Sequence, residues 1–103
     1  MWIIKSLVEK IDDELMDAEK YINCAYETKM DYPDVSMLFY KLSQEEMKHM
    51  QMLHTQVVQV IEEHKKTKEV PPVMKELYNY LHQRQVEWAA KIELKQKNFS
   101  TSK

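Results

Sequence analysis

The chain has 103 residues, close to the commonest size of a single domain. Its 15 Lys and Arg against 17 Asp and Glu leave a net charge of −2, which excludes a nucleic-acid binder that acts by neutralising phosphates. Glycine is absent, and this excludes P-loops, GxSxG elbows and EF-hand loops, because each needs glycine for a positive φ or a close backbone approach. Any chemistry must then be carried by side chains on helices.

The single cysteine, Cys24, cannot form an internal disulfide. With no signal peptide recognised, one cysteine favours a reducing, cytoplasmic setting. The apolar start of the chain is interrupted at Lys5, far short of the about 20 residues that a membrane-spanning helix needs. We therefore expect neither a membrane nor a nucleic acid as partner.

Apolar residues recur at helical spacing along three long segments, and short breaks that contain proline separate these segments. We predict helices over about residues 3–28, 33–65 and 71–97, within a single domain that covers residues 1–97. Residues 98–103 are predicted to form a polar, disordered tail.

The connections between the predicted helices are short, and short connections make consecutive helices antiparallel neighbours. We therefore predict an all-α fold in which three helices run up, down and up. The third helix carries large apolar residues on one face, namely Met74, Leu77, Leu81, Trp88 and Ile92.

Three ionisable residues stand where the helical pattern requires apolar ones. Glu14 interrupts the apolar register of the first helix, and Glu46 and His49 interrupt those of the second. Glu14 lies 17 residues before Asp31 in the turn and Glu46 lies 15 after it, so an antiparallel hairpin places both carboxylates at a similar height. Glu46 and His49 are neighbours on one helix face because they are spaced i, i+3. We expect all three side chains to project into the interior.

Two carboxylates and an imidazole in a low-dielectric interior are costly without a partner. A divalent cation offsets that cost, so the pattern predicts a metal site. Mixed oxygen and nitrogen ligands suit iron or manganese, whereas zinc prefers a tetrahedral set. The alternative is a histidine at the edge of the bundle that hydrogen-bonds Glu14 or Glu46 with no metal.

A family resemblance rests on these residues. The second segment resembles the second helix of rubrerythrins and other ferritin-like proteins through Tyr32-Pro33, Phe39, Leu42, Glu45-Glu46-Met47-Lys48-His49 and Leu53. The first segment is similar to the first helix of that family through Glu14, Ala18, Tyr21 and Ala25. The resemblance covers about residues 10–62. It implies that Glu14 is a terminal carboxylate ligand, Glu46 a bridging one and His49 the imidazole ligand.

The chain departs from the ferritin-like pattern because it supplies one half-site, whereas a full bundle has four helices and two half-sites. No second Glu-x-x-His follows residue 66. Two copies of the hairpin related by a twofold axis would rebuild four helices and a di-iron centre, as in encapsulated ferritins. We therefore expect a homodimer or a larger homo-oligomer, with iron as the first choice of metal.

By the same resemblance, the expected activity is oxidation of Fe(II) by oxygen or peroxide. The chain lacks the four cysteines of a rubredoxin-like module, so the electron donor remains unidentified. The alternative function is a non-enzymatic scaffold that keeps the hairpin for oligomerisation alone. The missing second half-site and the third helix favour this alternative.

The third helix holds further candidates. Glu87 falls near the height of His49 and is a possible additional ligand, although it lies one residue off the apolar face. His82 falls near the height of His54, and a hydrogen bond or ring stack between these two is preferred to a second metal site.

Overall fold

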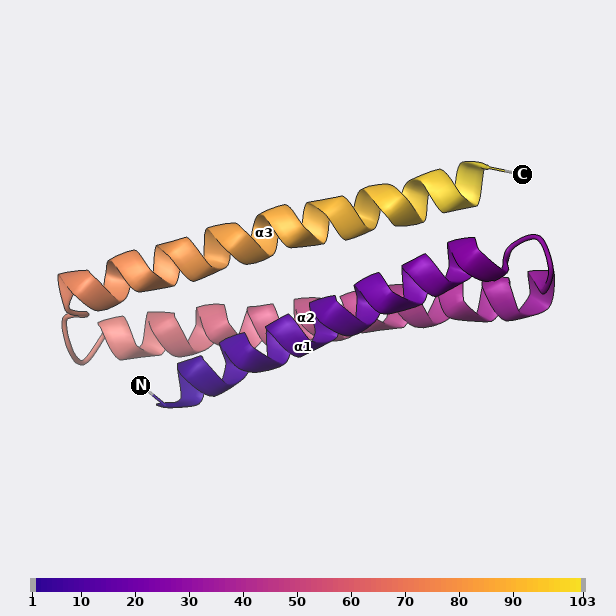
Figure 1. The fold of residues 1–103 in the computed structure, drawn as a ribbon. Coiled ribbons are helices and arrows are strands. Elements are labelled where there is room, and N and C mark those ends of the chain that lie inside the picture. The colour runs from indigo at the N-terminus through magenta and orange to yellow at the C-terminus, as the bar shows by residue number, and fades with distance from the viewer. Residues whose placement is uncertain (1, 103) are drawn as a thin grey trace.

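The computed structural model describes residues 2–102, and within this range the chain forms three helices and no strand. They are α1 (Trp2–Thr28), α2 (Pro33–Lys65) and α3 (Pro72–Thr101), which run antiparallel in turn (Figure 1). The prediction of an all-α chain with three helices is confirmed. The molecule is a rod that measures 55 × 18 × 17 Å.

The turn between α1 and α2 is built from the sequence signals that end one helix and begin another. Tyr32 N–H donates to the Thr28 carbonyl at 2.8 Å, which closes α1. Pro33 then opens α2 at a position where its missing N–H has no helical partner to lose. Asp34 in the first turn of α2 is favoured by the helix dipole.

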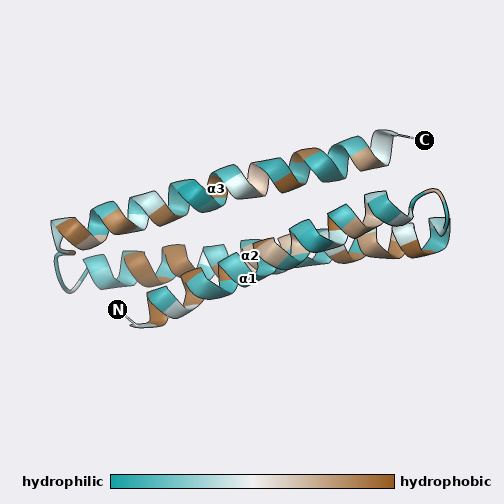
Figure 2. Cartoon of the chain, in the orientation of Figure 1, coloured by the Kyte–Doolittle hydropathy of each residue, from teal (hydrophilic) through white to brown (hydrophobic). Residues whose placement is uncertain are grey.

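The core is organised around α1, which packs extensively on α2 and less extensively on α3. Figure 2 shows hydrophobic and hydrophilic residues mixed along each helix, as expected where only one side is buried. The buried positions of α1 follow i, i+3, i+4 spacing: Ile4, Val8, Ile11, Leu15, Ala18, Ile22 and Ala25. This stripe faces the two neighbouring helices and supplies most of the core.

Small residues set the closest approach of α1 and α2. Ser36 and Ser43 on α2 are fully buried, with 1% and 0% exposure. Ser36 Oγ donates to the Ala25 carbonyl at 2.6 Å, and Ser43 Oγ donates to the Ala18 carbonyl at 2.7 Å. Because the side chains of alanine and serine are small, the backbones of α1 and α2 can approach closely at these positions.

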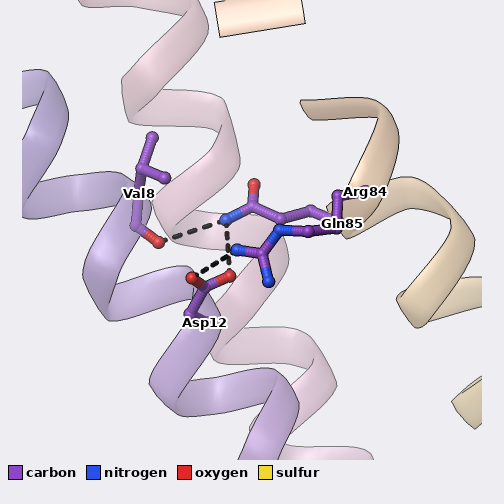
Figure 3. A network of polar contacts seen from close by, with 4 residues as sticks. All are labelled: Val8, Asp12, Arg84 and Gln85. Carbon is purple, nitrogen blue, oxygen red and sulfur yellow. Dashed lines mark hydrogen bonds and ion pairs between the residues drawn. The ribbon is translucent and has the colours of Figure 1, made fainter. Parts of the chain in front are cut away.

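Polar contacts to α1 hold α3 in place (Figure 3). Gln85 Nε2 donates to the Val8 carbonyl and to Asp12 Oδ1, each at 3.1 Å, and Arg84 pairs with Asp12 at 2.6 Å. Further along the helix, Tyr26 Oη donates to the Lys95 carbonyl at 2.8 Å. The contact of α3 with α2 is slight, so α3 is a third helix laid on one side of a hairpin.

The prediction of a disordered tail is wrong for residues 98–102. α3 continues to Thr101, and Phe99 is only 5% exposed. Its ring packs on Ile22 and Ala25. The centroids of the Phe99 and Tyr26 rings lie 5.3 Å apart, with the rings edge to face. The packing of Phe99 against residues far away in the sequence stabilises the last turns of α3. The polar composition of residues 98–103 gives no sign of this packing. Residue 103 of the predicted tail lies outside the described residues.

Among residues 2–102, no helix combines the length and the apolar character required to cross a bilayer.

Candidate metal centre

α1 and α2 bring Glu14, Glu46 and His49 together, as counting residues on each side of the turn predicted. Each of the three offers one ligand atom, and these atoms lie within 4.8 Å of one another. His49 Nδ1 is 3.5 Å from Glu14 Oε2 and 3.7 Å from Glu46 Oε2. The arrangement therefore forms a compact group of two carboxylates and one imidazole.

The expectation that all three side chains project into the interior is wrong. The side chain of His49 is 50% exposed, whereas those of Glu14 and Glu46 are 25% and 19% exposed. Glu14 belongs to a register with Leu7 and Tyr21, and all three are only partly buried. This register lies at the flank of the buried stripe of α1, so the group sits at the edge of the hairpin with its histidine toward solvent.

The carboxylates lie close enough to perturb each other. The pKa of Glu46 is raised above its usual value, first because the adjacent Glu14 carboxyl group favours its protonated form, then because of burial and the charge of Glu14. The nearby His49 acts in the opposite direction. Two negative charges at this distance are therefore unfavourable without a cation or a proton between them.

Glu14 also carries an unsatisfied acceptor. Its Oε2 atom is buried and has no hydrogen-bond partner among the described residues, because the His49 nitrogen at 3.5 Å does not meet hydrogen-bond geometry. A buried acceptor without a partner costs about 1–3 kcal/mol. An acceptor of this kind, beside a second carboxylate and an imidazole, fits a cation of the iron or manganese type.

The group formed by Glu14, Glu46 and His49 lies on the opposite side of α1 from α3. Asp12 binds α3 through Arg84 and Gln85. Glu14 is two residues further along, and two residues turn the helix by about 200°. The face that carries Glu14 is therefore the one that α3 leaves open, and α3 does not reach the group.

This placement excludes Glu87 as an additional ligand within one chain. Glu87 is exposed, accepts a hydrogen bond from Gln83 at 3.2 Å and is not part of the group. The sequence argument for Glu87 used only its expected position along the rod, and that position does not specify on which flank of α1 the third helix packs.

His54 and His82 form the ring stack that was expected of them. The rings of His54 and His82 stack with centroids 5.0 Å apart and an angle of 17° between planes. Burial lowers the pKa of His54, and the neighbouring His82 lowers it further. The pair therefore forms a stacked contact between α2 and α3.

Comparisons with models of known protein families, with curated proteins and with solved structures find no match to this chain.

Proposed function

We propose that the chain binds iron through Glu14, Glu46 and His49 and that a second copy completes the site. The observation that carries the proposal is the meeting of three ligand atoms within 4.8 Å, one of them a buried carboxylate oxygen without a partner. A cation relieves both the unsatisfied oxygen and the repulsion between the carboxylates. The resemblance to ferritin-like proteins supports iron over other divalent metals.

Three ligands from one chain leave coordination positions open, since metals of this class take up to six oxygen and nitrogen ligands. α3 lies on the far side of α1, so additional protein ligands must come from another molecule. The open face around the group carries half-buried apolar side chains, namely Leu7, Tyr21, Phe39, Leu42 and Leu53. Such a face favours an isologous contact in which two groups of three ligands meet.

Bound iron would supply redox chemistry with oxygen or peroxide, which is the activity that the resemblance implies. The residues of this chain would hold the metal and control access to it. Glu14 and Glu46 provide the negative charge that stabilises an oxidised metal, and the half-exposed His49 stands at the solvent side. The Tyr21 and Phe39 rings stack with centroids 6.1 Å apart, each seven residues from Glu14 or Glu46 on its own helix.

The test measures iron bound by the full chain purified without chelator and then supplied with Fe(II) under anaerobic conditions. We expect about one iron per chain, because two chains share two metals. The double variant Glu46→Ala with His49→Ala is expected to lose this iron. The matched control is Glu45→Ala with His64→Ala, which changes the same residue types on the same helix outside the group.

Light scattering on the same samples measures the oligomeric state. A dimer or larger species with bound iron supports the shared site, whereas a monodisperse monomer contradicts it. Stoichiometric iron retained by the Glu46→Ala, His49→Ala variant would refute the ligand assignment. An oligomer that takes up no iron would favour the scaffold function instead.

A further inference from the structure

The first part of α3, residues 72–83, is packed less tightly on the hairpin than the rest of the helix. We call this part the α3 arm. The buried residues of α3 are Gln85, Ile92 and Phe99, and all three lie beyond the arm. No residue of the arm is buried, and only Tyr78 and Leu81 within it are partly buried. Few contacts that exclude water therefore hold the arm in place.

The spacing of the buried positions shows where the packing weakens. Gln85, Ile92 and Phe99 are seven residues apart, and Tyr78 is the next position of the same register toward the α2–α3 loop. The Tyr78 hydroxyl is closed to solvent and has no hydrogen-bond partner among the described residues. A buried polar group without a partner is unfavourable, and detachment of the arm would return this hydroxyl to water.

The direct contact between α2 and the arm is the stack of the His54 and His82 rings, with centroids 5.0 Å apart. Elsewhere the contact of α2 with α3 is slight. Histidine is the side chain that gains a charge between about pH 7 and pH 5. Two positively charged rings at this separation repel each other, so acid weakens the contact that joins the arm to α2.

No free negative charge beside the two rings offsets this repulsion. Neither histidine forms an ion pair among residues 2–102. The acidic residues of α1 in the groove between the three helices are Asp12, which Arg84 and Gln85 already bind, and Glu9, which is exposed to solvent. The other charged or titratable side chains of this groove add positive charge or stay neutral in acid: Lys5, His64, Lys65, Lys75 and Tyr78.

The neighbours of each ring on its own helix are also uncharged at this pH. Those one turn away are Met50, Gln51, Val57 and Val58 on α2, and Tyr78, Asn79, Gln85 and Val86 on α3. The pKa of His54 is lowered by burial and then by the charge of His82, as expected for a ring without a negative partner.

The arm can leave the hairpin while the rest of α3 stays in place. Residues 66–71 join it to α2, and at full extension they span about 20 Å. At the other end of the arm, Arg84 and Gln85 bind Asp12 (Figure 3). Beyond this anchor, Ile92 and Phe99 are only 0% and 5% exposed and fix the helix.

We propose that the α3 arm is a pH-dependent flap, which the stacked His54 and His82 hold on α2 at neutral pH and release in acid up to the anchor at Arg84 and Gln85. Release uncovers the apolar floor of the groove, formed by residues such as Ile4 and Val57. The flap does not involve Glu14, Glu46 or His49, and it depends on neither a metal nor a second copy.

The test measures the distance between α2 and the arm by electron paramagnetic resonance on the doubly nitroxide-labelled full chain, with Cys24→Ser as background. Glu62→Cys and Glu76→Cys place one label on α2 and one on the arm, both at exposed positions. Glu45→Cys and Glu93→Cys form the matched pair on the same helices beyond the anchor. We expect the first distance to lengthen and broaden between about pH 7.5 and pH 5, and the second to stay unchanged.

The response should follow proton uptake by the two stacked rings. The equilibrium constant for opening should rise up to about tenfold per pH unit for each ring that takes up a proton. His54→Phe with His82→Phe keeps two aromatic rings that bind no proton, so the first distance should stay short in acid. His64→Phe makes the same change on α2 outside the stack, and this variant should open like the wild type. The second label pair checks that each variant is folded.

An unchanged first distance in the wild type between about pH 7.5 and pH 5 would overturn the proposal. Equal opening in the His54→Phe, His82→Phe variant would do the same, because charges outside the stack would then act. Lengthening of both distances together would mean that the whole chain unfolds, which also contradicts a flap. The Glu46→Ala, His49→Ala variant should open like the wild type, and loss of opening in it would assign the response to His49 instead.

Discussion

Replacement of Phe99 by alanine tests the largest difference between the sequence-based expectation and the structure. If residues 98–103 were a disordered tail, Phe99→Ala would leave stability unchanged. In the structure Phe99 is only 5% exposed. The centroid of its ring lies 4.9 Å from that of Tyr40 and 5.3 Å from that of Tyr26. Lys29 Nζ lies 5.1 Å from the same centroid, over the face of the ring. The side chain thus joins the end of α3 to both helices of the hairpin.

The magnitude follows from these contacts. Removal of a buried phenylalanine costs about 3–5 kcal/mol when the cavity does not collapse. The aromatic pairs account for about 0.5–1.5 kcal/mol each within that loss. Because the last turn of α3 is free to detach, relief of the cavity lowers the expected loss to about 2–4 kcal/mol in the free energy of unfolding.

The assay is urea denaturation followed by circular dichroism, with hydrogen exchange of the amides of residues 98–101 as a local readout. The matched control is Leu94→Ala, which truncates a side chain of α3 that is 59% exposed and should cost at most about 0.5 kcal/mol. Equal stability of Phe99→Ala and wild type, together with unprotected amides at residues 98–101 in the wild type, would refute the reasoning.

Three further predictions concern pH and the attachment of α3. Burial raises the pKa of Tyr78 from 10.0 to about 12, so this tyrosine ionises first in the unfolded chain and the free energy of unfolding should fall between pH 10 and 12. The Tyr78→Phe variant should lack this loss. Denaturation and tyrosinate absorbance measured across this pH range check the prediction. Burial and His82 lower the pKa of His54 below 6.5, so its neutral form favours folding, and the free energy of unfolding should fall as the pH drops below 6.5. The drop should be smaller in His54→Gln, and an unchanged profile would argue against the ring stack. Asp12→Ala removes an ion pair and a hydrogen bond to α3 and should cost about 1–2 kcal/mol in urea, against no change for the exposed Asp13→Ala.

The bounds of α1 and α2 were predictable because periodicity and proline act locally. The helices predicted over about residues 3–28 and 33–65 are observed at Trp2–Thr28 and Pro33–Lys65. The end of α3 was not predictable in this way, because Phe99 is held by partners on α1 and α2. Periodicity also failed to show that Leu77 stays 57% exposed, since apolar spacing marks a face without specifying what covers it.

For the candidate site, the sequence predicted the positions of the three residues along the helices, but it did not predict how deeply their side chains are buried. Residue counts from the turn and i, i+3 spacing suffice to bring Glu14, Glu46 and His49 together. A repeat of seven residues drifts by about 20° per repeat on a helix of 3.6 residues per turn. Sequence alone therefore did not distinguish the centre of the α1 stripe from its flank, where Glu14 lies.

The buried serines have a consequence for the geometry of the proposed ligands. Ser43 precedes Glu46 by three residues and bonds the carbonyl of Ala18, which follows Glu14 by four. This buried hydrogen bond between α1 and α2 thus lies about one turn from the two carboxylates and acts as their spacer. A bulkier residue at position 43 would hold the two acids apart without touching either, so the spacing of the proposed ligands depends on a hydroxymethyl group that is not one of them.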